Sequence, residues 1–377
     1  MCVSSPCLNN SSFRRAGVRA ERGTVLVLVL LIVALVAGLS VKFAAQYQLG
    51  LARAETRWHG TQARAFLEGT EEVAKLMFPE ADLDPGIDYL GEPWGSEVPI
   101  QDEGVSGFAR MTDATTQLNL NDLARPLNLE RPEGNYERYT EPQRRLIRLL
   151  QTFPDLPLDQ NQAENLIAAV VDWIDADDIE SGSGGAESNY YQGMKEPYRP
   201  ANALFKSVDE LRLVRGFNEN PMLVLRLTPF ITALPVADAG LNINTLDLVG
   251  PYGKGINNLL LCFNGTSDLV PMNAVDMEQF ISTRPATGFA DKQAITDAWN
   301  AMFAGKVLDL DGISTLTKYF WLNSTVQLVD QRRSMRSLLM RGTEQGTLKV
   351  IRRDDIFELP TVDRGEKDED GETELVE

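Results

Sequence analysis

The longest apolar run of the chain lies near its N-terminus. Residues 24–41 read TVLVLVLLIVALVAGLSV, without a charged side chain between Arg22 and Lys42. As a helix this run is roughly 27 Å long, which matches the hydrocarbon core of a bilayer. Arginines precede the run, and the positive-inside rule keeps such residues in the cytoplasm. The pattern therefore predicts one membrane-spanning helix, with the residues that follow it exported.

Apolar positions continue at near-helical spacing after this run and stop at Pro79. We predict one helix over residues 24–78, half in lipid and half amphipathic. Because a single domain covers only part of such a helix, we expect partner helices to pack on an apolar stripe along its second half. The stripe includes Tyr47, Leu51, Trp58 and Phe66.

The rest of the chain changes pattern twice. Residues 79–124 begin as a Pro- and Gly-rich connection and end in a strand-like stretch. Residues 125–305 have the pattern of helices joined by turns, and residues 306–356 contain β-rich runs that can form an antiparallel meander. Breaks between these runs are expected at Asn323, at residues 332–334 and at residues 342–346. We predict an α+β fold, in which the long helix packs on an antiparallel sheet and a large helical domain is inserted into that sheet.

Two internal patterns lie in or beside the predicted insert. Residues 207–234 contain two helix-like runs around Gly216, typical of a helix-hairpin-helix. The apolar residues of the first run should face those of the second across the turn: Leu211, Leu213, Val214 and Phe217 against Leu223, Leu225 and Leu227. The sequence LNLN at 118–121 recurs as LNIN at 241–244. An N-x-N step of this kind suits a strand or loop that caps the next helix through its Asn side chains.

The charge balance limits the possible functions. The chain has 36 Lys and Arg against 54 Asp and Glu, a net charge of −18, so most of its surface repels nucleic-acid phosphates. Only the arginines of the hairpin keep DNA binding open: Arg212, Arg215 and Arg226. His59 is the only histidine, and we expect it to be a surface or packing residue; we propose no catalytic residues. Residues 357–377 form an acidic tail that we expect to be disordered.

Residues 149–194 contain nine acidic residues and neither Lys nor Arg. Four of the carboxylates crowd into DWIDADD at 172–178, where the apolar Trp and Ile indicate contact with a core. Crowded carboxylates repel unless they are protonated or bridged by a cation, and Ca²⁺ accepts about six to eight oxygens. Glycines at 182, 184 and 185 allow the loop to fold back. A solvated acidic loop and a calcium site both remain open. The candidate ligands are Asp172, Asp175, Asp177, Asp178 and Glu187.

Two sets of motifs resemble a known family. A basic leader that ends in Gly23 directly before the apolar run resembles the type III signal of type IV pilins and pseudopilins, with cleavage before Thr24. Leu28 stands at the fifth mature position, where most pilins have Glu. Four further stretches are similar to the GspK family, the large minor pseudopilins of type II secretion. They are DWIDADD at 172–178, GGAESNYY at 184–191, PYRPANALFKSVDELRLVRGF at 197–217 and LNINT at 241–245.

This resemblance implies a non-enzymatic protein anchored by one helix in the bacterial inner membrane, with its C-terminal domain in the periplasm. The prepilin peptidase would cleave and methylate it. It would join GspI- and GspJ-like minor pseudopilins at the tip of the pseudopilus, together with the major pseudopilin and the inner-membrane assembly platform. Calcium would be held in the helical insert, Leu28 would suit a tip subunit, and no nucleic acid would bind. The competing hypotheses are a DNA-uptake pilin that uses the hairpin and a membrane-anchored, calcium-dependent hydrolase.

Overall fold

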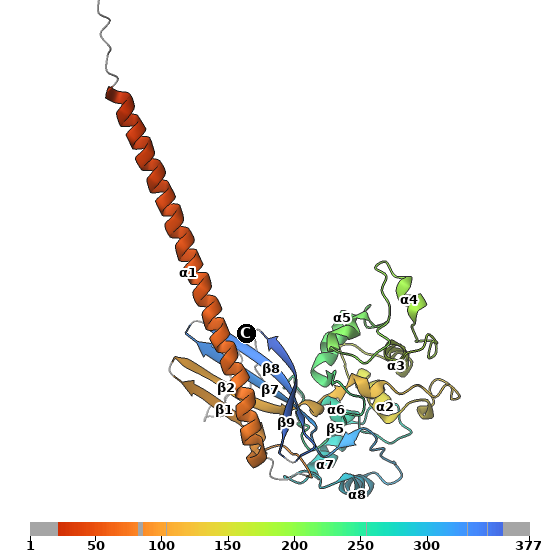
Figure 1. The fold of residues 1–377 in the computed structure, drawn as a ribbon. Helices are drawn as coiled ribbons and strands as arrows, with labels where there is room; N and C mark the ends of the chain where they lie inside the picture. Colours follow the sequence, from red (N-terminus) through yellow and green to blue (C-terminus); the bar gives the residue numbers. More distant parts are fainter. Residues whose placement is uncertain are drawn as a thin grey trace, which may run out of the picture. The chain divides into compact units, whose positions relative to one another are not determined.

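The structure is a computed structural model that describes residues 22–81, 86–102, 104–253, 255–329, 331–344 and 346–356 (Figure 1). The predicted leader, up to residue 21, and the acidic tail at 357–377 lie outside the described residues. The chain divides into two units, Met1–Thr61 and Gln62–Glu377.

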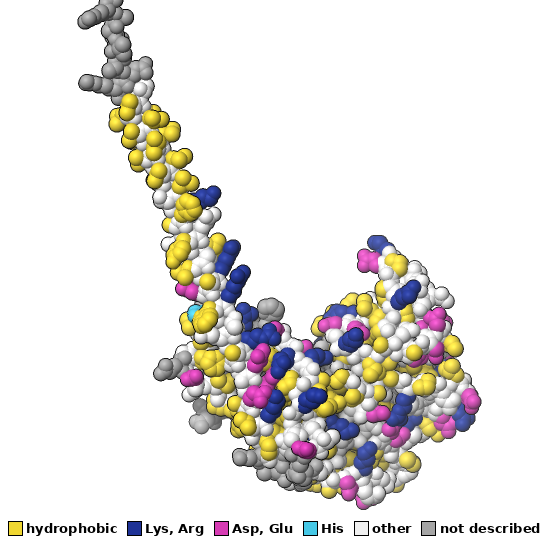
Figure 2. Space-filling model, in the orientation of Figure 1, with side chains coloured by type: hydrophobic (Ala, Val, Ile, Leu, Met, Phe, Trp, Pro, Cys, Tyr) yellow, Lys and Arg dark blue, Asp and Glu magenta, His cyan; other side chains and the backbone are white. Residues whose placement is uncertain are grey.

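A single helix, α1 (Arg22–Ala81), confirms the predicted long N-terminal helix. The part from Thr24 to Pro79 is long and apolar enough to cross a membrane, and Figure 2 shows the apolar side chains that surround its first half. The helix extends three residues beyond the predicted end, with Pro79 in its last turn. Because proline lacks a backbone N–H, it weakens the final turn, and the helix ends two residues later.

The second unit contains a five-stranded antiparallel sheet in the order β1-β2-β7-β8-β9. The part of α1 after Gln62 packs on one face of this sheet, where Phe78 contacts Phe320 and Leu67 lies beside Met335. The predicted α+β fold, with a long helix on an antiparallel sheet, is confirmed. The strands are β1 (Glu97–Asp102), β2 (Val105–Asp113), β7 (Tyr319–Leu328), β8 (Gln331–Arg341) and β9 (Leu348–Ile356).

Two of the three predicted strand breaks are wrong. Strand β7 continues through Asn323, and β8 continues through residues 332–334. The turn between them begins instead at Val329, which has a left-handed φ of 56°. Asn323, Arg332 and Ser334 lie on the sheet face away from α1, and Arg333 is an exposed residue on the other face, so these polar side chains belong to strands and do not mark turns. The break at residues 342–346 is confirmed, between β8 and β9.

The helical insert lies between β2 and β7 and therefore occupies residues 114–318, which is wider than the predicted 125–305. Its α-helices are α2 (Glu141–Leu150), α3 (Gln160–Ile174), α4 (Ser188–Gln192), α5 (Pro221–Leu227), α6 (Asn258–Leu261), α7 (Ala274–Ser282) and α8 (Lys292–Met302). Short 3-10 helices are η2 (Ala114–Thr116), η3 (Leu120–Leu123), η4 (Tyr136–Arg138), η5 (Val208–Leu213) and η6 (Thr228–Phe230), and η1 (Pro93–Gly95) precedes the sheet.

The repeated LNxN sequence corresponds to a repeated structure. Strand β3 (Leu118–Asn119) pairs in parallel with β4 (Ile231–Thr232), and β5 (Leu241–Asn242) pairs in parallel with β6 (Ile313–Ser314). In each copy, the side-chain amide of the second asparagine accepts a hydrogen bond from the N–H of one phenylalanine and donates one to the carbonyl of the same residue. Asn121 accepts from Phe205 N at 2.7 Å and donates to its carbonyl at 2.9 Å, and Asn244 does the same with Phe289 at 2.7 and 3.0 Å.

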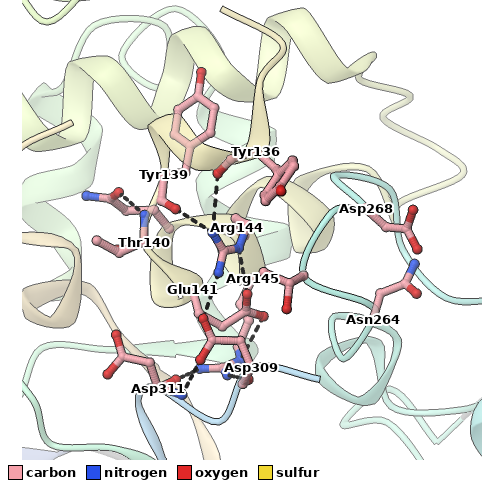
Figure 3. Close-up of polar contacts among 12 residues, drawn as sticks. Tyr136, Tyr139, Thr140, Glu141, Arg144, Arg145, Asn264, Asp268, Asp309 and Asp311 are labelled. Atoms are coloured by element: carbon pink, nitrogen blue, oxygen red, sulfur yellow. Dashed lines mark hydrogen bonds and ion pairs between the residues drawn. The ribbon is translucent and has the colours of Figure 1, made fainter. Parts of the chain in front are cut away.

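Helix α2 joins the two copies through buried charges (Figure 3). Glu141 is buried and accepts from Arg144 Nε and Arg148 Nη1, both at 2.6 Å. Arg148 also donates to the carbonyl of Cys262 at 2.9 Å, and Arg145 donates to that of Asp311 at 2.6 Å. The guanidinium groups therefore tie the first half of the insert to loops of the second half.

Candidate functional site

The acidic loop after α3 is organised by Asp172, which lies in the last turn of that helix. Its carboxylate is fully buried and accepts from the N–H groups of Ser181 at 3.1 Å and Ala186 at 2.8 Å. Burial raises the pKa of Asp172, although these hydrogen bonds act against the shift. The side chain thus closes the loop onto the end of α3.

The glycines of this loop are required by close approach to α3. A Cβ added to Gly184 would lie 2.2 Å from Asn165 Cα, and one added to Gly185 would lie 2.4 Å from Asp172 Oδ2. No larger residue fits without moving the backbone. The loop therefore folds back as expected, and it brings Glu187 to the end of α3.

Three of the five candidate ligands converge at this place. Asp175, Asp177 and Glu187 each offer a carboxylate oxygen within 4.8 Å of the others. Glu187 is only 2% exposed, and both of its carboxylate oxygens are buried without a hydrogen-bond partner, as is Asp175 Oδ1. Burial, and then the neighbouring carboxylates, raises the pKa of Glu187 to about 8 and that of Asp175 to about 6.

The other two candidates use their oxygens differently. Asp172 binds backbone N–H groups, and Asp178 Oδ1 accepts from the N–H of Ser188 at 3.2 Å, next to the start of α4. A hard cation with oxygen ligands fits the three converging carboxylates, since it neutralises their repulsion and pairs the orphaned oxygens. The ligand set, including Asp172 and Asp178, stays a prediction.

An aromatic cluster packs beside the acidic loop and was not predicted from the sequence. Trp173 contacts Tyr191 edge-on at 5.3 Å between ring centroids. Arg215 stacks on Tyr190 at 5.0 Å and donates to the carbonyl of Gly185 at 2.6 Å. The only sequence signal was the run of aromatics after the glycines. These contacts connect the acidic loop to the turn at Gly216.

The predicted hairpin around Gly216 is present, but its first run is the short 3-10 helix η5 and its second is the seven-residue helix α5. Gly216 has a φ of +80°, which explains why glycine stands at the turn. Five of the seven apolar residues expected to face each other are buried, whereas Leu213 and Leu225 are 44% and 53% exposed, so the expectation is wrong for these two. Short helices place only one apolar row against the core.

The arginines of the hairpin all have partners within the chain. Arg212 pairs with Asp209 at 3.4 Å, and Arg226 pairs with Asp155 at 2.5 Å. Arg215 binds the acidic loop. The guanidinium groups that kept DNA binding open therefore serve the structure, and the geometry favours a structural hairpin.

The expected partner-binding residues of α1 are mostly exposed. Leu28, Tyr47, Leu51 and Trp58 are between 48% and 73% exposed. Phe66 differs from the expectation, because it is partly buried and packs beside Leu67 against the sheet. Sheet packing begins one turn earlier along the helix than the amphipathic pattern indicated.

A separate apolar groove of about 570 Å³ lies in the second unit, between α1 and the β1 side of the sheet. Phe66, Val73 and Met77 of α1 form one wall. Trp94 and Ile100 contribute to the other wall. The sheet and α1 alone do not fill this groove, and Val73 remains 46% exposed.

Comparison with known proteins agrees with these features. The family model for type II secretion system protein K matches residues 116–236. Type II secretion system protein K of Pseudomonas aeruginosa is 30% identical, over 89% of this chain and 93% of its own, and that of Aeromonas hydrophila is 29% identical, over 89% and 97%.

The fold also has a solved counterpart. A chain of the crystal structure of the GspK-GspI-GspJ complex from enterotoxigenic Escherichia coli matches with a TM-score of 0.64 and 22% identity, covering 80% of this chain and 99% of that chain. At this level of identity the match establishes the shared fold. Together with the near full-length relatives, it shows that the chain belongs to the type II secretion system protein K family, the GspK minor pseudopilins.

Proposed function

We propose that this minor pseudopilin caps the type II secretion pseudopilus, with residues 24–41 in the inner membrane and the sheet and insert in the periplasm. One observation carries this proposal: the insert at 114–318 interrupts a pilin-like sheet between β2 and β7. A subunit inside a helical filament has neighbours above and below, which leave little room for such a domain. Only the end of the filament has space for it. At that end, Leu28 also avoids an unpaired carboxylate in lipid.

The proposed partners are the N-terminal helices of other minor pseudopilins. The solved relative belongs to a complex with GspI and GspJ. We propose that helices of GspI- and GspJ-like proteins cover the exposed stripe of α1 in the first unit and contact the groove beside Val73 in the second. Both surfaces are apolar and exposed, as a partner helix requires.

We further propose that the acidic loop holds one structural Ca²⁺ ion. Asp175, Asp177 and Glu187 would supply carboxylate oxygens, and backbone carbonyls and water would complete the set. The ion would stiffen the loop at the end of α3. The calcium-dependent hydrolase hypothesis has less support, because the relatives are secretion components and no histidine lies in this loop.

The test is assembly of the full chain, coexpressed with the other minor pseudopilins and purified in detergent. Val73→Glu places a charge in the groove, and we expect loss of the heteromeric complex on size exclusion. Val275→Glu is the matched control, because Val275 is 62% exposed on α7, outside the groove, and it should assemble normally. A complex that forms equally well with both variants would count against the groove as the contact. A wild-type chain that never co-purifies with the partners would contradict the proposed function.

A further inference from the structure

The sheet face away from α1 is basic, although the chain as a whole is acidic. On β8, alternate residues such as Met335 and Ser337 contact the α1 side, so Arg336 projects from the other face. The insert covers only one end of that face, where Leu234 packs on Trp321 and Leu338. The face carries four arginines, which we call the basic face: Arg110, Arg332, Arg336 and Arg352, of which Arg352 also donates to the carbonyl of Lys206 in the insert at 3.1 Å.

Arg336 is the centre of the basic face. Its guanidinium carbon lies 3.9 Å from the ring centroid of Trp321, and that of Arg352 lies 5.2 Å from the same ring. Arg336 Nε and Trp321 Nε1 are both buried without a hydrogen-bond acceptor. Within the part of the chain that the structure describes, Arg336 forms no ion pair. The guanidinium of Arg336 and the indole N–H of Trp321 can therefore still donate to an anionic acceptor.

The local acidic residues do not neutralise this face. Asp354 is bound to Arg352 at 3.0 Å, and Glu97 lies opposite Arg110 on the edge strand. Asp354 also lies opposite Arg336 in the β8–β9 register, but among the described residues neither Arg336 nor Arg332 forms an ion pair. By contrast, Arg353, which points toward α1, is paired with Glu71 at 2.7 Å. The α1 side of β9 thus pairs its arginine, whereas the basic face keeps a positive surplus.

We propose that the acidic C-terminal segment, residues 357–377, docks on the basic face of its own chain, with its carboxylates at Arg336. The segment has nine acidic and two basic residues. It begins directly after Ile356, which pairs with Ser334 on β8, two positions from Arg336. The distance across the face from β9 to β2 is three strand spacings of about 4.8 Å each. A few extended residues of the segment are long enough to cross it. Charge, position and length all fit this occupant.

The test uses the full chain and a chain that ends at Ile356, both in detergent, with a fluorescent peptide of residues 357–377. The peptide should bind the shortened chain and bind the full chain at least about tenfold more weakly, because the attached segment competes at high effective concentration. Raising the salt from about 50 to 300 mM should weaken binding severalfold.

Variants of both partners separate this contact from general charge attraction. In the shortened chain, Arg336→Gln should weaken binding at least about fivefold, since it removes a charge-assisted contact. Arg333→Gln is the matched control, because Arg333 is an exposed arginine on the opposite face of the same strand, and binding should stay within about twofold. A peptide with Asp368, Glu369 and Asp370 changed to amides should bind weakly, and this change leaves the fold of the protein untouched.

Three results would overturn the proposal. The first is equal binding of the peptide to the full and shortened chains. The second is an equal loss with Arg336→Gln and Arg333→Gln. The third is binding of anionic phospholipid vesicles to the shortened chain, while the peptide neither binds nor competes; the basic face would then be a membrane contact.

Discussion

Replacing Glu187 by Gln should change stability in opposite directions with and without calcium. Without the ion, the Glu187 carboxylate is buried among other carboxylates with no hydrogen-bond donor. Its neutral amide isostere removes that repulsion. With the ion, the same change removes one anionic ligand. If the acidic loop were merely solvated, Glu187→Gln would not change the stability either with or without calcium.

The magnitude follows from the pKa of Glu187, which burial and the neighbouring carboxylates raise from 4.5 to about 8. An acid with a raised folded-state pKa lowers stability as pH rises, because the unfolded chain ionises first. The loss begins near the unfolded pKa and is complete above the folded pKa. At about 1.4 kcal/mol per pKa unit, the loss above pH 8 reaches at most about 5 kcal/mol. Glu187→Gln should therefore raise the thermal midpoint in EGTA by several degrees at about pH 8.5.

Calcium reverses the sign of this effect. At a free concentration one hundred times the dissociation constant, a ligand that binds only the folded state stabilises it by about 2.7 kcal/mol. The wild-type chain should gain this stability with Ca²⁺ at about pH 8.5, and Glu187→Gln should lose most of the gain. Because ligand carboxylates must be ionised, calcium should bind more weakly as pH falls toward about 5.

The assay is thermal unfolding of the detergent-solubilised chain in EGTA and in Ca²⁺, followed by circular dichroism. Glu180→Gln is the matched control, since Glu180 is an exposed residue of the same loop and makes the same change in charge. Its midpoints should stay close to those of the wild type in both conditions. A wild-type midpoint that does not respond to Ca²⁺, together with a lower midpoint for Glu187→Gln in EGTA, would refute the reasoning.

Three further predictions concern the fold, each measured as the free energy of unfolding in urea. Gly216→Ala should destabilise the protein by about 1–2 kcal/mol more than Gly134→Ala. Both glycines have a positive φ, but only a Cβ added at 216 would lie close to another side chain, 2.6 Å from Leu166. Equal losses of stability in the two variants would contradict this prediction. Glu141→Gln should destabilise by about 3–5 kcal/mol because it leaves buried guanidinium groups without their carboxylate, and a near-neutral result would mean that water enters. Val329→Gly should stabilise by about 0.5–1 kcal/mol by removing β-branched strain at a φ of 56°, and a loss would show that the valine packs favourably.

The sequence by itself determined the long helix, the fold class and the family. The apolar run at 24–41 and the near-helical apolar spacing after it specified α1 almost to its end, because a membrane span is apolar on all sides and a helix that packs on one side repeats its apolar residues regularly. The repeated LNxN sequence marked two structural copies, because the asparagine amide imitates a backbone pairing that needs one residue type at one place. The crowding in DWIDADD and the glycines after it also pointed to the loop where three carboxylates meet.

Only the tertiary structure decided which side of each strand or loop a residue faces. Polar residues at Asn323 and 332–334 looked like turns, yet they lie within strands: Asn323, Arg332 and Ser334 are on the face away from α1, and Arg333 is on the other face. Asp172 and Asp175 have the same chemistry in the sequence, but one binds backbone N–H groups and the other keeps an unpaired oxygen. Local patterns record whether a position is polar. The partner of a polar atom depends on segments that lie far away along the chain, so it is settled only when those segments pack together.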